Sequence, residues 1–204
     1  MLPNNYMTKG LLSLSFLLAA HLGYSQLDFG VKSGINIATT KNLITFPKNR
    51  MGFYGGAFSQ IPISKKLFFQ PELLFSSKGY RYVDLSDRKN VSMRLNYLNF
   101  PILLGYKIDS KTKLILGIEP GLFLSAINYL NKRNYNATNS FPIKFDIGTA
   151  IGVSYNIRKD IGVEIRYVYG FKEFYQTDEV GNKRGEGLAS NRAFQIGLYY
   201  HIHK

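Results

Sequence analysis

Apolar and polar residues alternate along most of this chain. Residues 143–157 show the pattern most clearly, because their odd positions are nearly all apolar. Those positions are Ile143, Phe145, Ile147, Thr149, Ile151, Val153, Tyr155 and Ile157. A period of two residues is typical of a β-strand with one apolar and one polar face.

The same alternation predicts eight strands, joined by connections that are short and long in turn. The strands are expected at about residues 27–37, 51–61, 67–80, 92–107, 113–126, 142–157, 161–172 and 193–203. The short connections are residues 62–66, 108–112 and 158–160, and the long ones are 38–50, 81–91, 127–141 and 173–192. Outer-membrane barrels combine short periplasmic turns with long external loops. The pattern therefore predicts an all-β fold, an eight-stranded antiparallel up-and-down transmembrane β-barrel.

The segment 92–107 is less regular than the other strands. Arg94 has the parity opposite to Leu95, yet Leu98 and Leu104 continue an apolar row with the parity of Arg94. A β-bulge before Pro101 would let one strand switch face in this way, and we predict a bulge there.

Alternation alone does not decide which face of the barrel is outside, since a soluble lipocalin-type barrel turns its apolar face inward. Three features favour a lipid-facing exterior. The polar row mixes glycines with opposite charges, which suits a narrow lumen. The connections are unequal in length. Aromatic residues also lie near strand ends, where interfacial girdles occur, namely Tyr167, Tyr169, Phe171, Tyr199 and Tyr200.

The N-terminus has the features of a cleavable signal peptide. Lys9 precedes an apolar stretch over residues 11–22, which is shorter than the ~20 residues that a spanning helix needs. Small residues at Gly23 and Ser25 predict cleavage before Gln26, whether translation begins at Met1 or at Met7. We expect residues 1–25 to be the signal peptide and 26–204 to form one barrel domain, located in the outer membrane.

Composition narrows the possible partners. The chain has a formal net charge of +13 and no cysteine, which excludes a disulfide scaffold. Its basic residues are scattered, and an exported chain rarely meets nucleic acid, so no nucleic-acid partner is predicted. Lysines and arginines at the rim would either neutralise anionic lipid headgroups or lie in solvated loops.

Charged residues on the polar row form the candidate site. They are Lys32, Glu72, Arg94, Glu119, Lys144, Asp146, Glu164 and Arg166. An eight-stranded barrel is only wide enough for its own side chains, and unpaired buried charge costs several kcal/mol. The charges are therefore expected to pair and plug the lumen, with a gated ion path as the alternative.

Other chemistry is weakly indicated. His201 and His203 share a strand face, but no third metal ligand is evident near them and both lie at the periplasmic end. Residues 178–187 mix charges with glycine without the spacing of a calcium loop. We predict no catalytic residue, no cofactor and no metal, and we expect the protein not to be an enzyme.

Several segments resemble the outer-membrane β-barrel proteins of Bacteroidetes that are often called the porin family. They are LDFGVKSGINIATT (27–40), the Gln70-Pro71-Glu72-Leu73 stretch, LNYLNFPILLGYKI (95–108), GIEPGLFLSA (117–126), FDIGTAIGVSYNI (145–157) and GVEIRYVYG (162–170). The resemblance implies an eight-stranded outer-membrane barrel without shared catalytic residues. It also implies contact with outer-membrane lipid, lipopolysaccharide and the barrel-insertion machinery.

The predicted function is a non-enzymatic outer-membrane barrel that is structural or binds an extracellular partner through its long loops. A small channel for ions or solutes is the alternative, and a lipid-acting enzyme is a third hypothesis.

Overall fold

A computed structural model describes residues 28–41, 47–84, 89–130, 133–141, 143–177 and 183–203. The expected signal peptide, residues 1–25, and residues 178–182 of the last connection lie outside the described residues. No helix in the described part is long and apolar enough to cross a membrane.

The described residues form ten β-strands and one short 3₁₀-helix. They are β1 (Asp28–Lys41), β2 (Lys48–Pro62), β3 (Leu67–Asp84), β4 (Lys89–Asn99), β5 (Ile102–Lys107), β6 (Thr112–Leu130), β7 (Arg133–Asn136), η1 (Thr138–Ser140), β8 (Phe145–Asn156), β9 (Ile161–Thr177) and β10 (Lys183–His203). Every pairing between strands is antiparallel.

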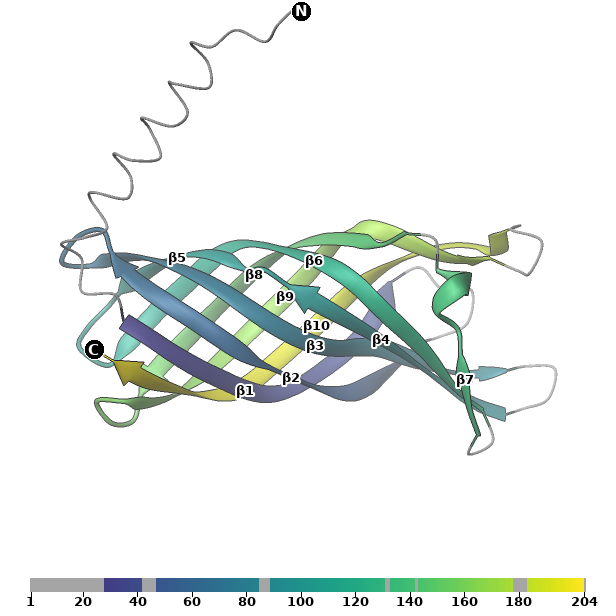
Figure 1. Cartoon of the computed structure of the whole chain (residues 1–204), viewed down its shortest axis with the longest axis horizontal. Helices are drawn as coiled ribbons and strands as arrows, with labels where there is room; N and C mark the ends of the chain where they lie inside the picture. Colours follow the sequence, from purple (N-terminus) through teal and green to yellow (C-terminus); the bar gives the residue numbers. More distant parts are fainter. Residues whose placement is uncertain are drawn as a thin grey trace, which may run out of the picture.

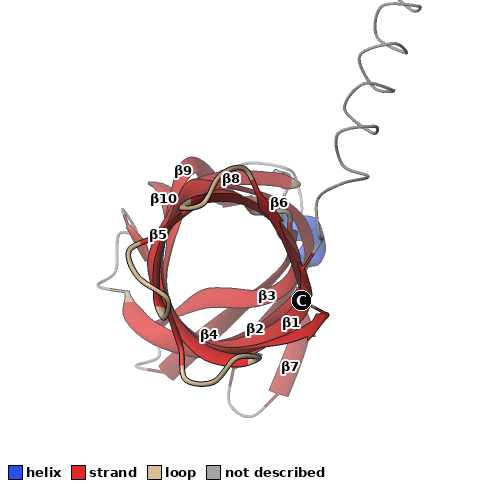
Figure 2. Cartoon of the chain, turned by 90° about the vertical axis from the view of Figure 1, so that its left-hand side faces the viewer, coloured by secondary structure: helices blue, strands red, loops and turns tan. Residues whose placement is uncertain are grey.

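The strands close into a ring (Figures 1 and 2). The ring follows the order of the strands along the chain: β4 and β5 together fill one position between β3 and β6, β6 pairs with β8, and β10 returns to β1. The small β7 pairs only with β6 and stands outside the ring order. The predicted eight-stranded barrel is confirmed, because β4 and β5 are two halves of one barrel strand.

The two ends of the barrel differ. At one end, which we call the turn end, residues 63–66, 108–111 and 157–160 join adjacent strands. Asp109 Oδ1 accepts the backbone N–H of Lys111 (2.7 Å) and of Thr112 (2.8 Å). These bonds stabilise the carboxylate and lower the pKa of Asp109. At the opposite end, the loop end, the strands run further than predicted, so that β9 and β10 include residues 173–177 and 183–192 of the expected loop.

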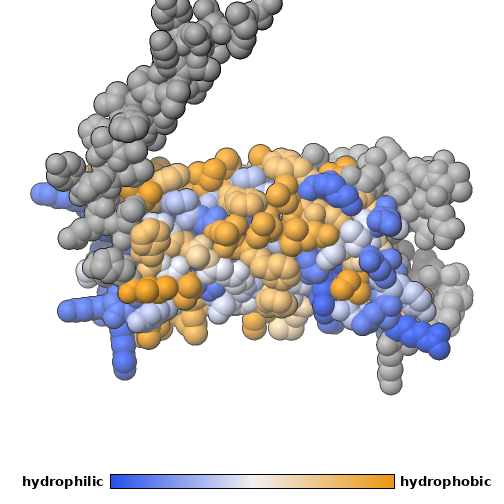
Figure 3. Space-filling view, viewed as in Figure 1, coloured by the Kyte–Doolittle hydropathy of each residue, from blue (hydrophilic) through white to orange (hydrophobic). Residues whose placement is uncertain are grey.

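The apolar row faces outward. Leu116, Ile151 and Leu198 are 54 %, 55 % and 56 % exposed, while the residues beside them in sequence are buried or partly buried. Figure 3 shows apolar residues gathered across the middle of the visible face, with hydrophilic residues towards both ends. A transmembrane barrel needs such a band, so the soluble lipocalin-type alternative is wrong.

One of the aromatic residues predicted to form the interfacial girdle faces the other way. Tyr167, Phe171 and Tyr200 are exposed on the outer wall, but Tyr199 is 4 % exposed inside the barrel. Tyr199 follows Leu198 directly, and adjacent strand residues point to opposite faces. Its ring packs edge-on against Phe58, with 6.1 Å between ring centroids.

The strand around Pro101 does not switch face. Odd positions point inward throughout, from Met93 and Leu95 in β4 to Leu103 in β5, and Pro101 interrupts the strand between them. The backbone stays bonded across the interruption, because Phe100 N–H donates to Pro120 O and Glu72 N–H donates to Pro101 O. What changes is the chemistry of each face, since the interior becomes apolar towards the loop end.

Glycine lets large rings lie across the interior. Gly105 points inward from β5, and a Cβ there would lie within 2.4 Å of three atoms of the Phe68 ring. Phe68 is 1 % exposed, so its ring occupies the space that a side chain at residue 105 would take. Side chains rather than solvent therefore fill this part of the lumen.

Candidate functional site

Four charged side chains from three strands meet inside the barrel. Lys32 lies on β1, Glu72 on β3, and Glu164 and Arg166 on β9. Each lies on the inward row of its strand, and none is more than 6 % exposed. Because the strands close into a ring, these rows face one another across the lumen.

Arg166 and Lys32 each bridge the same two carboxylates. Arg166 donates to both carboxylate oxygens of Glu72, at 2.8 and 3.0 Å, and to Glu164 Oε1 at 2.8 Å. Lys32 Nζ donates to Glu72 Oε1 at 2.9 Å and to Glu164 at 3.0 Å. The two-pronged bond between Arg166 and Glu72 is the stronger kind of charge-assisted pair.

A second ion pair extends this cluster. Lys78 Nζ lies 2.9 Å from Glu119 Oε1, Asn99 also donates to that oxygen, and Glu119 Oε2 lies 3.9 Å from Arg166 Nη1. The six residues Lys32, Glu72, Lys78, Glu119, Glu164 and Arg166 carry three positive and three negative charges. We call them the lumen ion cluster, and it is neutral as a whole.

Uncharged polar groups continue the network along the barrel axis. On one side, Asn36 donates to Ser76 Oγ and accepts from Gln195 Nε2, at 3.0 and 2.9 Å. On the other side, Gln70 donates to Glu72 at 2.5 Å and accepts from Gln60, which in turn accepts from Lys113. A buried polar group without a hydrogen bond destabilises the fold, so this series of hydrogen bonds holds the side chains in place.

Three of the residues predicted to line the lumen do not join the lumen ion cluster. Arg94 is on the outer wall, where its guanidinium carbon lies 4.8 Å from the centroid of the Tyr129 ring. Lys144 is exposed and donates to Phe141 O at 2.8 Å. Asp146 lies inside the barrel nearer the loop end, where one carboxylate oxygen is buried and the other accepts from Asn191 Nδ2 at 2.8 Å. The other five, Lys32, Glu72, Glu119, Glu164 and Arg166, belong to the lumen ion cluster.

Two buried lysines were missing from the sequence analysis. Lys78 and Lys113 are 3 % and 5 % exposed. Parity would have identified both, because Lys78 has the parity of Glu72 along β3 and Lys113 that of Glu119 along β6.

An apolar layer lies inside the barrel towards the loop end. It is formed by Tyr80, Met93, Leu95, Tyr97, Phe123, Ala126 and Phe141, all buried. Phe123 packs between Tyr97 and Phe141, with centroid distances of 5.6 Å on each side. On the side of β3, β4 and β6, aromatic and aliphatic side chains therefore fill the interior between the lumen ion cluster and the loop end.

The histidine at the turn end, His201, contacts a carboxylate and two aromatic rings. His201 Nδ1 lies 2.8 Å from Asp28 Oδ1, and its ring packs against Phe58 and Tyr199. The side chain of His203 lies outside the described residues. Among the described side chains, no group of three His, Asp or Glu residues could hold a metal ion.

A ring of eight antiparallel strands, apolar outside and charged inside, defines the class of integral outer-membrane β-barrels. Residues 17–176 match the family model described as outer membrane protein beta-barrel domain, and the chain belongs to that family. The family places the protein in the outer membrane. No curated protein is matched by the sequence.

Solved structures with the same fold are distant in sequence. Neisserial surface protein A is 15 % identical with a TM-score of 0.54, over 85 % of this chain and 97 % of its own. Ail, the attachment invasion locus protein of Yersinia pestis, is 12 % identical with a TM-score of 0.51, over 86 % and 98 %. OprG from Pseudomonas aeruginosa is 12 % identical with a TM-score of 0.50, over 88 % and 98 %. At these identities the likeness concerns the fold alone.

Proposed function

We propose that this protein is a non-enzymatic outer-membrane barrel with a sealed lumen, which presents its loop end to the outside for contact with a partner. The observation that carries the proposal is the lumen ion cluster. Its charged side chains form ion pairs with one another, so they are not available to bind or guide a solute.

The packing on both sides of the cluster supports a seal. The apolar layer around Phe123 fills the side of β3, β4 and β6 towards the loop end, and the amide chain of Gln60 and Gln70 lies towards the turn end. An ion crossing the barrel would have to separate buried ion pairs, which costs several kcal/mol, and then pass beside the apolar layer.

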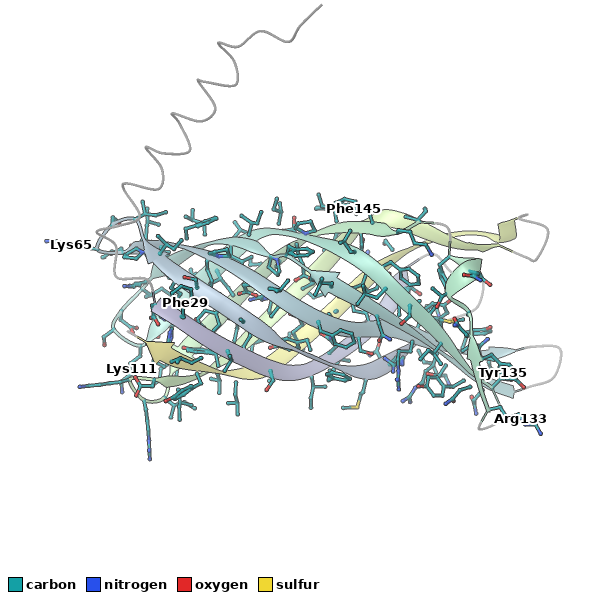
Figure 4. The ribbon with its side chains drawn as sticks, viewed as in Figure 1. Phe29, Lys65, Lys111, Arg133, Tyr135 and Phe145 are labelled. Atoms are coloured by element: carbon teal, nitrogen blue, oxygen red, sulfur yellow. The ribbon has the colours of Figure 1, made fainter. Side chains whose placement is uncertain are left out.

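The loop end supports the partner-binding part of the proposal. Strands β6, β7, β9 and β10 extend there, and exposed groups such as Arg133 and Tyr135 lie on this extension, far from Lys65 and Lys111 at the turn end (Figure 4). Rigid scaffolds commonly carry recognition on such extensions. Ail, a structural neighbour with a TM-score of 0.50 in this form, has been solved in complex with a heparin analogue.

A small channel remains the second candidate, because charged side chains from opposite walls of the lumen are the groups that a conducting path would also use. The two functions differ in whether the lumen ion cluster ever opens in the native protein, which conductance measures directly.

The orientation that partner binding requires can be tested with single cysteines, since the chain has none of its own. Tyr135→Cys places a thiol at the loop end and Lys111→Cys at the turn end, both at exposed positions. We expect a membrane-impermeant maleimide to label Tyr135→Cys on intact cells, and Lys111→Cys only after the outer membrane is permeabilised. The reverse pattern would contradict the proposal, and equal labelling after permeabilisation is the control for thiol reactivity.

A further inference from the structure

A pocket of about 610 Å³ lies towards the loop end of β2, β3, β4 and β6. Four of the described residues that line it are cations, Lys48, Arg50, Arg81 and Arg94, and none is an acid. Neutral residues complete the described lining, and they are Met51, Tyr82, Asn90, Val91, Ser92 and Tyr129.

The arginines of the pocket have no carboxylate partner in the described part of the chain. Arg50 is only 6 % exposed and donates to two neutral acceptors, Lys78 O at 3.1 Å and Ser77 Oγ at 3.4 Å. Arg94 Nε is buried and lacks a hydrogen-bond partner among the described atoms. Gathered cations repel one another, so an anion bound between them would be stabilised.

The backbone is irregular beside this pocket. Gly79 pairs with Arg94 across β3 and β4, and its φ of +129° lies in a region that favours glycine. A Cβ at Gly79 would lie 2.0 Å from Met93 O. The ladder between β2 and β3 is also irregular between Asn49 and Tyr54, next to Arg50. Both irregularities occur where the cations gather.

The position of the pocket along the membrane normal places it at the level of the lipid headgroups. The outward apolar row of β4 ends at Leu98, and Arg94 follows four residues nearer the loop end. Four residues span about 13 Å of strand, or about 10 Å along the membrane normal at the usual tilt. The headgroup region begins just beyond the hydrocarbon core, so Arg94 and its neighbours lie at its level. Figure 3 shows hydrophilic residues on this face beyond the apolar band.

We infer that this basic pocket binds the phosphate groups of a phosphorylated glycolipid headgroup in the outer leaflet. Arginine forks match phosphate oxygens in pairs, and Tyr82 and Tyr129 line the same pocket. The inference rests on the loop end facing outward, which the cysteine labelling tests separately. It does not depend on whether the lumen conducts.

The test compares three forms of the refolded full-length protein in detergent micelles, titrated with lipid A and read by native mass spectrometry. The forms are the wild type, the pocket variant Arg50→Gln/Arg81→Gln/Arg94→Gln, and the matched control Lys65→Gln/Lys66→Gln/Lys111→Gln, which removes three charges at the turn end. We expect the pocket variant to bind lipid A at least about tenfold more weakly, and the control to bind like the wild type.

Further arms of the experiment separate the sources of the anion. Dephosphorylated lipid A is expected to bind as weakly to the wild type as lipid A does to the pocket variant. The inference would be overturned by equal binding of both lipids, by competition from inorganic phosphate at the same concentration as lipid A, or by binding of sucrose octasulfate without lipid A. Each form is first shown to be folded by its heat-dependent gel shift. The single variant Arg81→Gln, at an exposed position, should lose about threefold if the triple variant does not fold.

Discussion

Replacing Arg166 with methionine should destabilise the folded barrel by about 3–5 kcal/mol, the usual cost of removing one partner from a buried ion pair. Arg166 is 1 % exposed and bonds to both Glu72 and Glu164. Without it, Lys32 alone faces these two carboxylates, and the lumen ion cluster carries an uncompensated negative charge. Urea unfolding of the refolded protein in phospholipid vesicles measures the effect.

Two further variants test whether the loss of stability comes from the unpaired charge. Arg94→Met removes an arginine from the outer wall, where its contact is a ring face, and should cost no more than about 1 kcal/mol. Adding Glu164→Gln to Arg166→Met removes the excess charge and should recover part of the loss, which appears as coupling in a double-mutant cycle. Equal effects of Arg166→Met and Arg94→Met would show that the lumen ion cluster does not stabilise the barrel.

Placing an arginine at Ile151 should cost about 2–4 kcal/mol, the range for a basic residue on the lipid face at the bilayer midplane. Ile151 is 55 % exposed in the middle of β8, and it pairs with Leu116 and Tyr167 on the adjacent outer wall. A guanidinium there must leave water for hydrocarbon or distort the bilayer around it.

The matched control for this expectation lies in the turn after β8. Ile157 is 54 % exposed and is followed by Arg158 and Lys159, at the edge of the apolar band. Ile157→Arg should cost about 0–1 kcal/mol, because a basic residue near the interface reaches the headgroups. The difference between the unfolding free energies of the two variants in vesicles shows how much deeper residue 151 lies in the membrane than residue 157. Equal costs would mean that the outer wall around Ile151 does not face lipid.

The barrel could be predicted from the sequence because lipid imposes one rule on all eight strands. Most outward residues in the band are apolar, so alternation along residues 143–157 or 113–126 specifies both the strand and its outer face. The connections are short and long in turn, which then predicts an up-and-down barrel with turns at one end and loops at the other. The same parity placed Lys32, Glu72, Glu164 and Arg166 inside before any contact between them was known.

Beyond the membrane, the alternation of apolar and polar residues no longer predicts which side chains face outward. Beyond Leu98 the outer wall becomes polar and the interior apolar, so Arg94 lies outside and Leu95 and Tyr97 lie inside. Their inward packing depends on Phe123 and Phe141 from distant parts of the chain, which no local pattern indicates. The pocket around Arg50 and Arg94 was missed for the same reason, since its cations come from three strands.

Single-channel recording of the wild-type protein in a planar lipid bilayer tests the sealed lumen most directly. The protein must first be shown to be folded by its heat-dependent gel shift, so that silence cannot reflect failed insertion. A sealed lumen predicts no discrete current steps over the range of voltages that the bilayer tolerates. Discrete, ion-selective steps from the wild type would contradict it, and would mean that the pairs among Lys32, Glu72, Glu164 and Arg166 line a conducting path.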